Sequence, residues 1–280
     1  MKSVIINADD FGLSEEFNKA ILEGYKDTLL LSASLCANGD CFYDAVTKII
    51  SGCKNLGVGV HLNVMEGKSL TKCDLLTDIK GNFKFGYLDF ILNSYTKVFL
   101  RQIETEFRSQ IEKIKKYIRI DHLDSHVHVH AIPQIFELTC RLAKEYNIND
   151  VRIQYEKLYF VPKIKNYATF HYPINLAKVA LLNTFTKNNR KIIKKYGLTT
   201  TDFILGVNYT GMMDSDTIFY GLKRLNELYS DCIVKVLFHP CLYDKQINNH
   251  HYTEFLITQD KNLETNIKSM NFNIINCKNI

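Results

Sequence analysis

Short apolar runs alternate along the chain with segments of helical periodicity. Residues 3–8, 29–36 and 58–64 are compact, largely apolar stretches of the length of a buried strand. Residues 14–25 carry apolar side chains at helical spacing behind a serine that suits a helix N-cap, and residues 42–50 predict a second helix. This alternation is typical of βα units that build a mostly parallel sheet.

The rest of the chain continues the pattern. Residues 102–117 form a clear amphipathic helical pattern, and Pro133 suits the first position of the next helix. Residues 67–98 predict a long loop, and residues 157–200 predict one or two helices. Because there is no internal repeat or linker, we expect one α/β domain spanning residues 1–280. The remaining expected elements are strands at 151–153, 202–209, 232–239 and 271–275, and helices at 217–229 and 254–266.

Composition narrows the class of protein. The 280 residues are 46% hydrophobic and 23% charged, as in ordinary globular proteins. The formal charge of +5 is small for a nucleic-acid-binding domain, so nucleic acid is not an expected partner. The 8 cysteines form no C-x-x-C pair, which disfavours a zinc ribbon and favours reduced thiols. The apolar run at residues 4–6 is shorter than a signal-peptide core, so we expect a cytoplasmic protein.

Histidine is concentrated in one short segment. His122, His126, His128 and His130 hold four of the 9 histidines, and with Asp124 they would share one face of an ideal strand. His122 and His130 would then lie roughly 26 Å apart, too far to share one metal ion. His126 and His128 could share one, with a third ligand from elsewhere. The alternative is a solvated or hydrogen-bonded histidine cluster.

Three further positions at predicted strands carry chemistry. Asp9 and Asp10 follow an apolar strand, and adjacent carboxylates repel unless a cation or a proton lies between them. They therefore predict one metal ligand and one general base, or else a turn or helix cap. His61 is either a metal ligand or a hydrogen-bonded core histidine. His239 ends another apolar strand and suits a general acid, because histidine titrates near neutral pH.

The motifs at these strand ends resemble the YdjC family of carbohydrate deacetylases, whose best-described branch acts on chito-oligosaccharides. The resemblance runs from end to end of the chain and in the same order. It implies a distorted β/α barrel related to other polysaccharide deacetylases. The matching segments are residues 7–14, 37–39, 59–62, 67–71, 122–130 with 133–136, and 239–240, and more loosely Val151-Arg152.

The resemblance also implies a role for each candidate residue. The resemblance assigns one metal ligand, His126, to the histidine-rich segment, in place of the pair formed by His126 and His128. Val127 stands where some relatives have another histidine, and we expect its side chain to face away from the site. The implied set is Asp10, His61 and His126 as metal ligands, Asp9 as general base, His239 as general acid, and Asp124, His128 and Arg152 as substrate-binding or supporting groups.

The implied activity is metal-dependent removal of an N-acetyl group from an amino sugar, oligosaccharide or glycoconjugate, with release of acetate. Magnesium is implied by the resemblance, whereas a donor set of two nitrogens and one oxygen suits zinc. One alternative is another barrel metallohydrolase of the amidohydrolase or phosphoesterase type. Those enzymes commonly place H-x-H on the first strand, where this chain has Asp9-Asp10. A second alternative is an inactive sugar-binding paralogue.

The expected partner is thus an acetylated amino sugar. The chain has no Trp, so the apolar ring faces among its 16 Tyr and 17 Phe would have to stack against sugar rings. The basic run at residues 187–195 follows an apolar stretch, which allows a membrane-surface function, but a solvated helix face is the favoured interpretation. Membrane association is therefore not expected, and a homodimer is left open.

Overall fold

A computed structural model describes residues 1–26, 29–162, 167, 169–242 and 249–280. Within them, eight parallel strands form one sheet in the order β5-β4-β3-β2-β1-β7-β6, and β8 pairs with β1. The strands are β1 (Lys2–Phe11), β2 (Ser32–Leu35), β3 (Gly57–Leu62), β4 (His122–Ser125), β5 (Asp150–Val151), β6 (Phe203–Leu205), β7 (Cys232–Phe238) and β8 (Phe272–Ile274).

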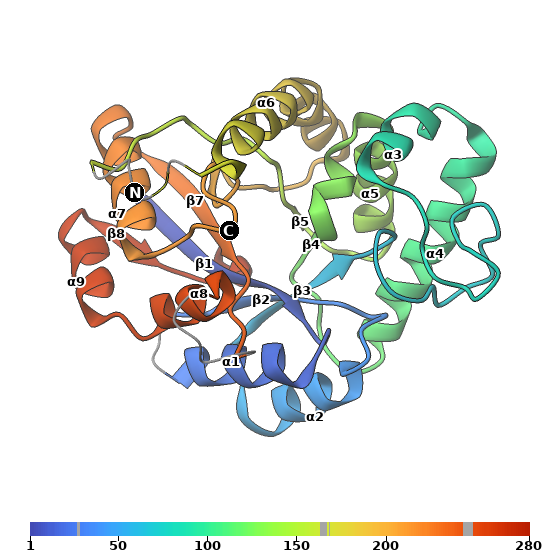
Figure 1. Ribbon diagram of the computed structural model, residues 1–280, viewed down its shortest axis with the longest axis horizontal. Coiled ribbons are helices and arrows are strands. Elements are labelled where there is room, and N and C mark those ends of the chain that lie inside the picture. The colour runs from blue at the N-terminus through green and yellow to red at the C-terminus, as the bar shows by residue number, and fades with distance from the viewer. Residues whose placement is uncertain (27–28, 163–166, 168, 243–248) are drawn as a thin grey trace.

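Helices surround this curled sheet (Figure 1). No helix of the described residues has the length and apolar character needed to cross a membrane. The α-helices are α1 (Glu15–Lys26), α2 (Phe42–Gly52), α3 (Tyr87–Asn93), α4 (Lys97–Lys115), α5 (Pro133–Glu145), α6 (His171–Tyr196), α7 (Ser215–Leu228), α8 (His250–Thr258) and α9 (Lys261–Ser269), with short 3-10 helices η1 (His126–Ala131) and η3 (Cys277–Asn279).

The expected distorted β/α barrel is confirmed by this arrangement. The side chains of Val4, Ile5 and Ile6 in β1 are fully buried, as expected for a parallel strand covered on both faces. The gap between the edge strands is bridged by a backbone hydrogen bond, in which the amide of Ile204 in β6 donates to the carbonyl of Tyr155 at 2.9 Å. The sheet therefore curls into a barrel whose two edges do not form a full ladder.

Most predicted elements are present, with differences of extent. The expected loop at residues 67–98 contains the short helix α3, and α4 starts earlier than predicted, at Lys97. The helix predicted at 254–266 is two helices, because the side chain of Asp260 caps α9 by accepting hydrogen bonds from the amides of Asn262 and Leu263. In the 157–200 segment one helix, α6, is present, and residues 163–166 and 168 lie outside the described residues.

The expectation that residues 122–130 form one extended strand is wrong. Strand β4 ends at Ser125, and the chain turns into η1 with left-handed backbone at Val127 (φ 51°) and His128 (φ 59°). A β-branched residue rarely adopts this conformation, so nothing in the local pattern predicts it. The five polar side chains consequently do not share a face, and the histidines of the segment point to different surroundings.

Candidate metal centre and active site

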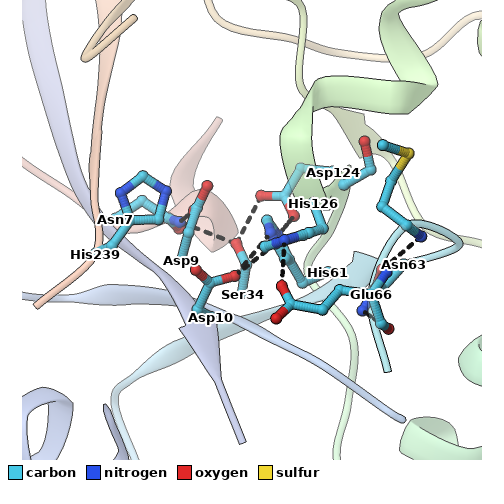
Figure 2. Close-up of polar contacts among 12 residues, drawn as sticks. Asn7, Asp9, Asp10, Ser34, His61, Asn63, Glu66, Asp124, His126 and His239 are labelled. Carbon is cyan, nitrogen blue, oxygen red and sulfur yellow. Dashed lines mark hydrogen bonds and ion pairs between the residues drawn. The ribbon is translucent and has the colours of Figure 1, made fainter. Parts of the chain in front are cut away.

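The predicted site residues gather at the carboxyl ends of the strands, where parallel-sheet barrels place their active sites. Asp9 and Asp10 lie near the end of β1, at an irregularity in its register with β2. Consecutive residues of a regular strand face opposite sides. The irregularity and the left-handed backbone of Asp10 (φ 65°) bring both carboxylates to the same site. Figure 2 shows them beside His61 from β3 and His126 from η1.

Asp10, His61 and His126 form a compact group that suits a divalent cation. The Oδ1 atom of Asp10 lies 2.9 Å from Nδ1 of His126 and 3.4 Å from Nε2 of His61. One candidate ligand atom from each residue lies within 4.8 Å of the others. Burial tends to raise the pKa of Asp10, but His126 and the other nearby histidines lower it below the usual range. One carboxylate and two imidazoles are a donor set typical of protein-bound zinc and of related divalent ions.

Each of these two histidines is held by a second carboxylate on its other ring nitrogen. The Nδ1 atom of His61 lies 2.7 Å from Oδ1 of Asp124 in β4. The Nε2 atom of His126 lies 3.1 Å from Oε2 of Glu66. Such pairs orient a metal-binding imidazole and fix its tautomer. Asp124 thus supports His61, while Glu66 was not among the predicted residues although it precedes the segment 67–71 that carries the family resemblance.

Arg152 lies just after β5 and is fully buried against Asp9. Its Nη1 donates to Oδ2 of Asp9 at 2.7 Å and its Nη2 to Oδ1 at 2.6 Å. Burial would raise the pKa of Asp9, but Arg152 and then His61 lower it below its usual value. Arg152 also forms an ion pair with Asp124. Asp9, His61 and Asp124 are a second group with metal-ligand spacing, but the guanidinium already forms ion pairs with both carboxylates there, so the Asp10 group fits a cation better.

His239 follows β7 and is paired with Glu254 of α8. Its Nδ1 lies 3.4 Å from Oε2 of Glu254, and its backbone amide donates to the same oxygen. Burial tends to lower the pKa of His239, but Glu254 outweighs this and raises it to about 9. His239 therefore carries a proton at neutral pH. Glu254 is fully buried. It was not among the predicted residues, because nothing in the sequence of α8 indicates that this carboxylate contacts His239.

Only some side chains of the histidine-rich segment, residues 122–130, lie at the site. His128 faces the same cavity as Asp9 and His239, and burial together with Arg152 lowers its pKa to about 3, so the ring is neutral. Val127 is 46% exposed and also lines this cavity, so the expectation that it faces away is wrong. The left-handed turn at these two residues is the physical reason. His130 points elsewhere, toward Ser125 and the backbone of Arg152.

A cavity of about 310 Å³ opens beside these groups. Asp9, His61, His126 and His239 form its polar wall. A cavity of about 460 Å³ lies at the opposite ends of the strands, around Asp121 and Asp150, and carries none of the predicted site residues. The 310 Å³ cavity therefore holds the candidate chemistry, with an ionised carboxylate and a protonated imidazole in the same lining as two of the candidate metal ligands.

Comparisons with known proteins place this geometry in a family. A carbohydrate deacetylase of Clostridium beijerinckii is 40% identical over 148 residues, which are 52% of this chain and 58% of that protein. A carbohydrate deacetylase of Brevibacillus brevis is 35% identical over 147 residues, which are 52% of this chain and 57% of that protein. The chain thus spans somewhat more than half the length of these curated relatives.

A solved structure from Enterococcus faecalis V583, named for cellobiose-phosphate cleavage, superposes with a TM-score of 0.76. It covers 99% of this chain and 98% of its own at 20% identity, which supports the shared fold. The family model described as YdjC-like protein matches residues 3–269, nearly the whole chain. On that match, the chain belongs to the YdjC-like family.

Proposed function

We propose that this protein removes the acetyl group from an N-acetylated amino sugar, with a divalent metal ion as cofactor. One observation carries the proposal: Asp9, held ionised by Arg152, and His239, held protonated by Glu254, line one cavity with His61 and His126. Hydrolysis of an amide needs a base for the attacking water and an acid for the leaving amine. The relatives named carbohydrate deacetylase support a sugar as the bearer of the acetyl group.

Asp10, His61 and His126 would hold the metal ion. When bound, a divalent ion supplies polarisation of the acetyl carbonyl and a lowered pKa of water. Two imidazole nitrogens and one carboxylate suit zinc by their softness, and the family resemblance favours magnesium. Asp124 and Glu66 would keep the two imidazole rings oriented toward Asp10.

The side chains of this chain would then move two protons. Asp9 takes the proton of the attacking water, for which its Oδ2 keeps a free lone pair beside the single hydrogen bond from Arg152. His239 gives its proton to the nitrogen of the amino sugar as the carbon–nitrogen bond breaks. The products are acetate and a free amine, and Glu254 keeps His239 oriented for the next turnover.

The test is acetate release from N-acetylglucosamine, N,N′-diacetylchitobiose and N-acetylated glycoconjugates. We expect acetate from at least one of them, loss of activity on dialysis against a chelator, and recovery on adding back one divalent metal. Metal analysis of the purified protein identifies the ion. If the metal-loaded protein releases no acetate from any of these substrates, the proposal is wrong.

A further inference from the structure

The cavity beside the candidate catalytic groups has a second wall of a different character. Besides Asp9 and His239, it is lined by apolar side chains from four places in the chain. Thr210 is on this wall, but its hydroxyl already donates to backbone carbonyls of Gly206 and Val207. Apart from the buried Tyr87 hydroxyl, which has no hydrogen-bond partner among the described residues, the hydroxyl groups of a second sugar ring would find few partners there. The mainly apolar members of this wall are the aromatic ring of Tyr87 and the side chains of Val127, Leu181, Leu182 and Val207.

The apolar wall continues out of the cavity along α6. Phe170, Ile174 and Leu181 recur at helical spacing, which places them on one face of the helix. They are 83%, 42% and 36% exposed. Lys178 lies on the same face and lines the cavity, and within the described residues it forms no ion pair. Its aliphatic stem extends the apolar path while its ammonium group reaches solvent.

Exposed apolar surface that leads into a cavity is typical of a ligand groove. The two walls differ in what they can bind. The polar wall offers the groups for amide hydrolysis, together with the buried Nδ1 atom of His128, which has no hydrogen-bond partner among the described residues. The second wall offers mostly carbon, apart from the hydroxyl groups of Tyr87 and Thr210 and the ammonium group of Lys178. A substrate that satisfies both is amphipathic, with the acetamido sugar on one side and hydrocarbon on the other.

We propose that the substrate is an N-acetylated amino sugar whose aglycone is apolar, and that this aglycone lies along the face formed by Ile174, Lys178 and Leu181 of α6 together with Phe170, which precedes the helix. This inference rests on the proposed deacetylase function and names its substrate class. The aglycone is a hydrocarbon group in glycosidic linkage. The apolar path along α6 leads away from the catalytic groups, where the acetyl group is bound, and toward solvent. Leu181 is the residue that determines specificity, since it belongs both to the cavity lining and to the exposed face.

The test compares acetate release from methyl and octyl N-acetylglucosaminide, with the octyl compound below its micelle-forming concentration. Each buried methylene strengthens binding about fourfold, so burial of two or more gives a preference of about tenfold or greater in kcat/KM for the octyl compound. Leu181→Asn should reduce this octyl-to-methyl ratio toward one. The matched control is Leu228→Asn, at a similarly exposed leucine (44%) at the end of α7, outside the cavity lining, where the ratio should not change.

Three kinetic outcomes overturn the inference. One is a wild-type ratio near one. Another is an octyl preference that Leu181→Asn leaves intact, and the third is a clear preference for N,N′-diacetylchitobiose or for a methyl glycoside with an N-octanoyl group. Sedimentation measurements test for the alternative occupant of this face of α6, which is a second copy of the chain. A dimer that Leu181→Asn dissociates would make this face of α6 an interface, and the aglycone assignment would be wrong.

Failure of the proposed function has a different signature. If no glycoside releases acetate, the deacetylase proposal fails. Calorimetric titration with the two glycosides still tests whether the apolar wall binds the aglycone. Tighter binding of the octyl compound that is lost in Leu181→Asn supports the apolar path independently of turnover. Equal binding of both compounds by the wild-type protein contradicts it.

Discussion

Arg152 holds Asp9 through two hydrogen bonds, from Nη1 to Oδ2 at 2.7 Å and from Nη2 to Oδ1 at 2.6 Å, across 143 positions of the chain. Both side chains are buried, and Arg152 also pairs with Asp124, which in turn holds His61. One guanidinium therefore joins the candidate general base to the support of a candidate metal ligand. Changes on either side of this pair should separate catalysis from metal binding.

Replacing Asp9 by Asn should abolish the activity while metal binding persists. The amide cannot accept a proton from water, and loss of a general base costs about 10²- to 10⁴-fold in rate. Arg152 keeps Asp124 but loses one of its two carboxylates, so the free energy of unfolding should fall by about 3 kcal/mol. Acetate release, metal analysis and urea unfolding measure the three quantities. An Asp9→Asn variant with full activity contradicts the assignment of the base.

Asp124→Asn should weaken metal binding, and it should also lower the free energy of unfolding by about 3 kcal/mol, because Arg152 loses one of its two buried carboxylates. The amide cannot act as an ionic partner of His61, and loss of such a partner costs about 10- to 100-fold in metal affinity. Glu66→Gln should act in the same direction through His126, with a smaller effect because Glu66 is largely exposed. Competition with a chelator of known affinity measures both. Asp44→Asn, at a carboxylate of α2 that pairs with Lys48, is the control. Equal affinities in all variants would falsify the paired-carboxylate account.

The activity should fall at high pH because His239 must carry a proton. Its pKa is raised to about 9, so the acid form is present at neutral pH and is lost as the pH rises through that value. We expect kcat/KM to decline about tenfold per pH unit above pH 9. Glu254→Gln removes the main group that raises this pKa, so the decline should move to lower pH. An unshifted alkaline limb in that variant argues against His239 as the acid.

The barrel interior contains a second buried ion pair whose loss should affect stability alone. Nζ of Lys235 in β7 lies 3.2 Å from Oδ2 of Asp150 at the start of β5, and both side chains are buried. Lys235→Met leaves the carboxylate without its cation and should cost about 3–5 kcal/mol in urea unfolding. Adding Asp150→Leu should recover most of that loss, because two apolar side chains need no partner. A double variant no more stable than the single one contradicts this explanation.

The sequence by itself determined the fold class and most of the candidate site. Apolar runs of strand length alternate with helical segments, and in a parallel sheet this alternation places every strand end at one edge. The Asp9-Asp10 pair, His61 and His239 follow from that rule together with the family resemblance. The sequence predicts a helix in the region of α6, but it does not predict that this helix forms a wall of the cavity.

Only the tertiary structure decided which partner each supporting carboxylate holds. Asp124 faces His61, Glu66 faces His126 and Glu254 faces His239 because the sheet order and the packing of α8 bring them together. No spacing rule along the chain connects such pairs. The left-handed turn at Val127 and His128 ends β4 early, against the alternation of the local sequence. Backbone strain of this kind persists only where the surrounding structure holds it, so it cannot be predicted from the segment itself.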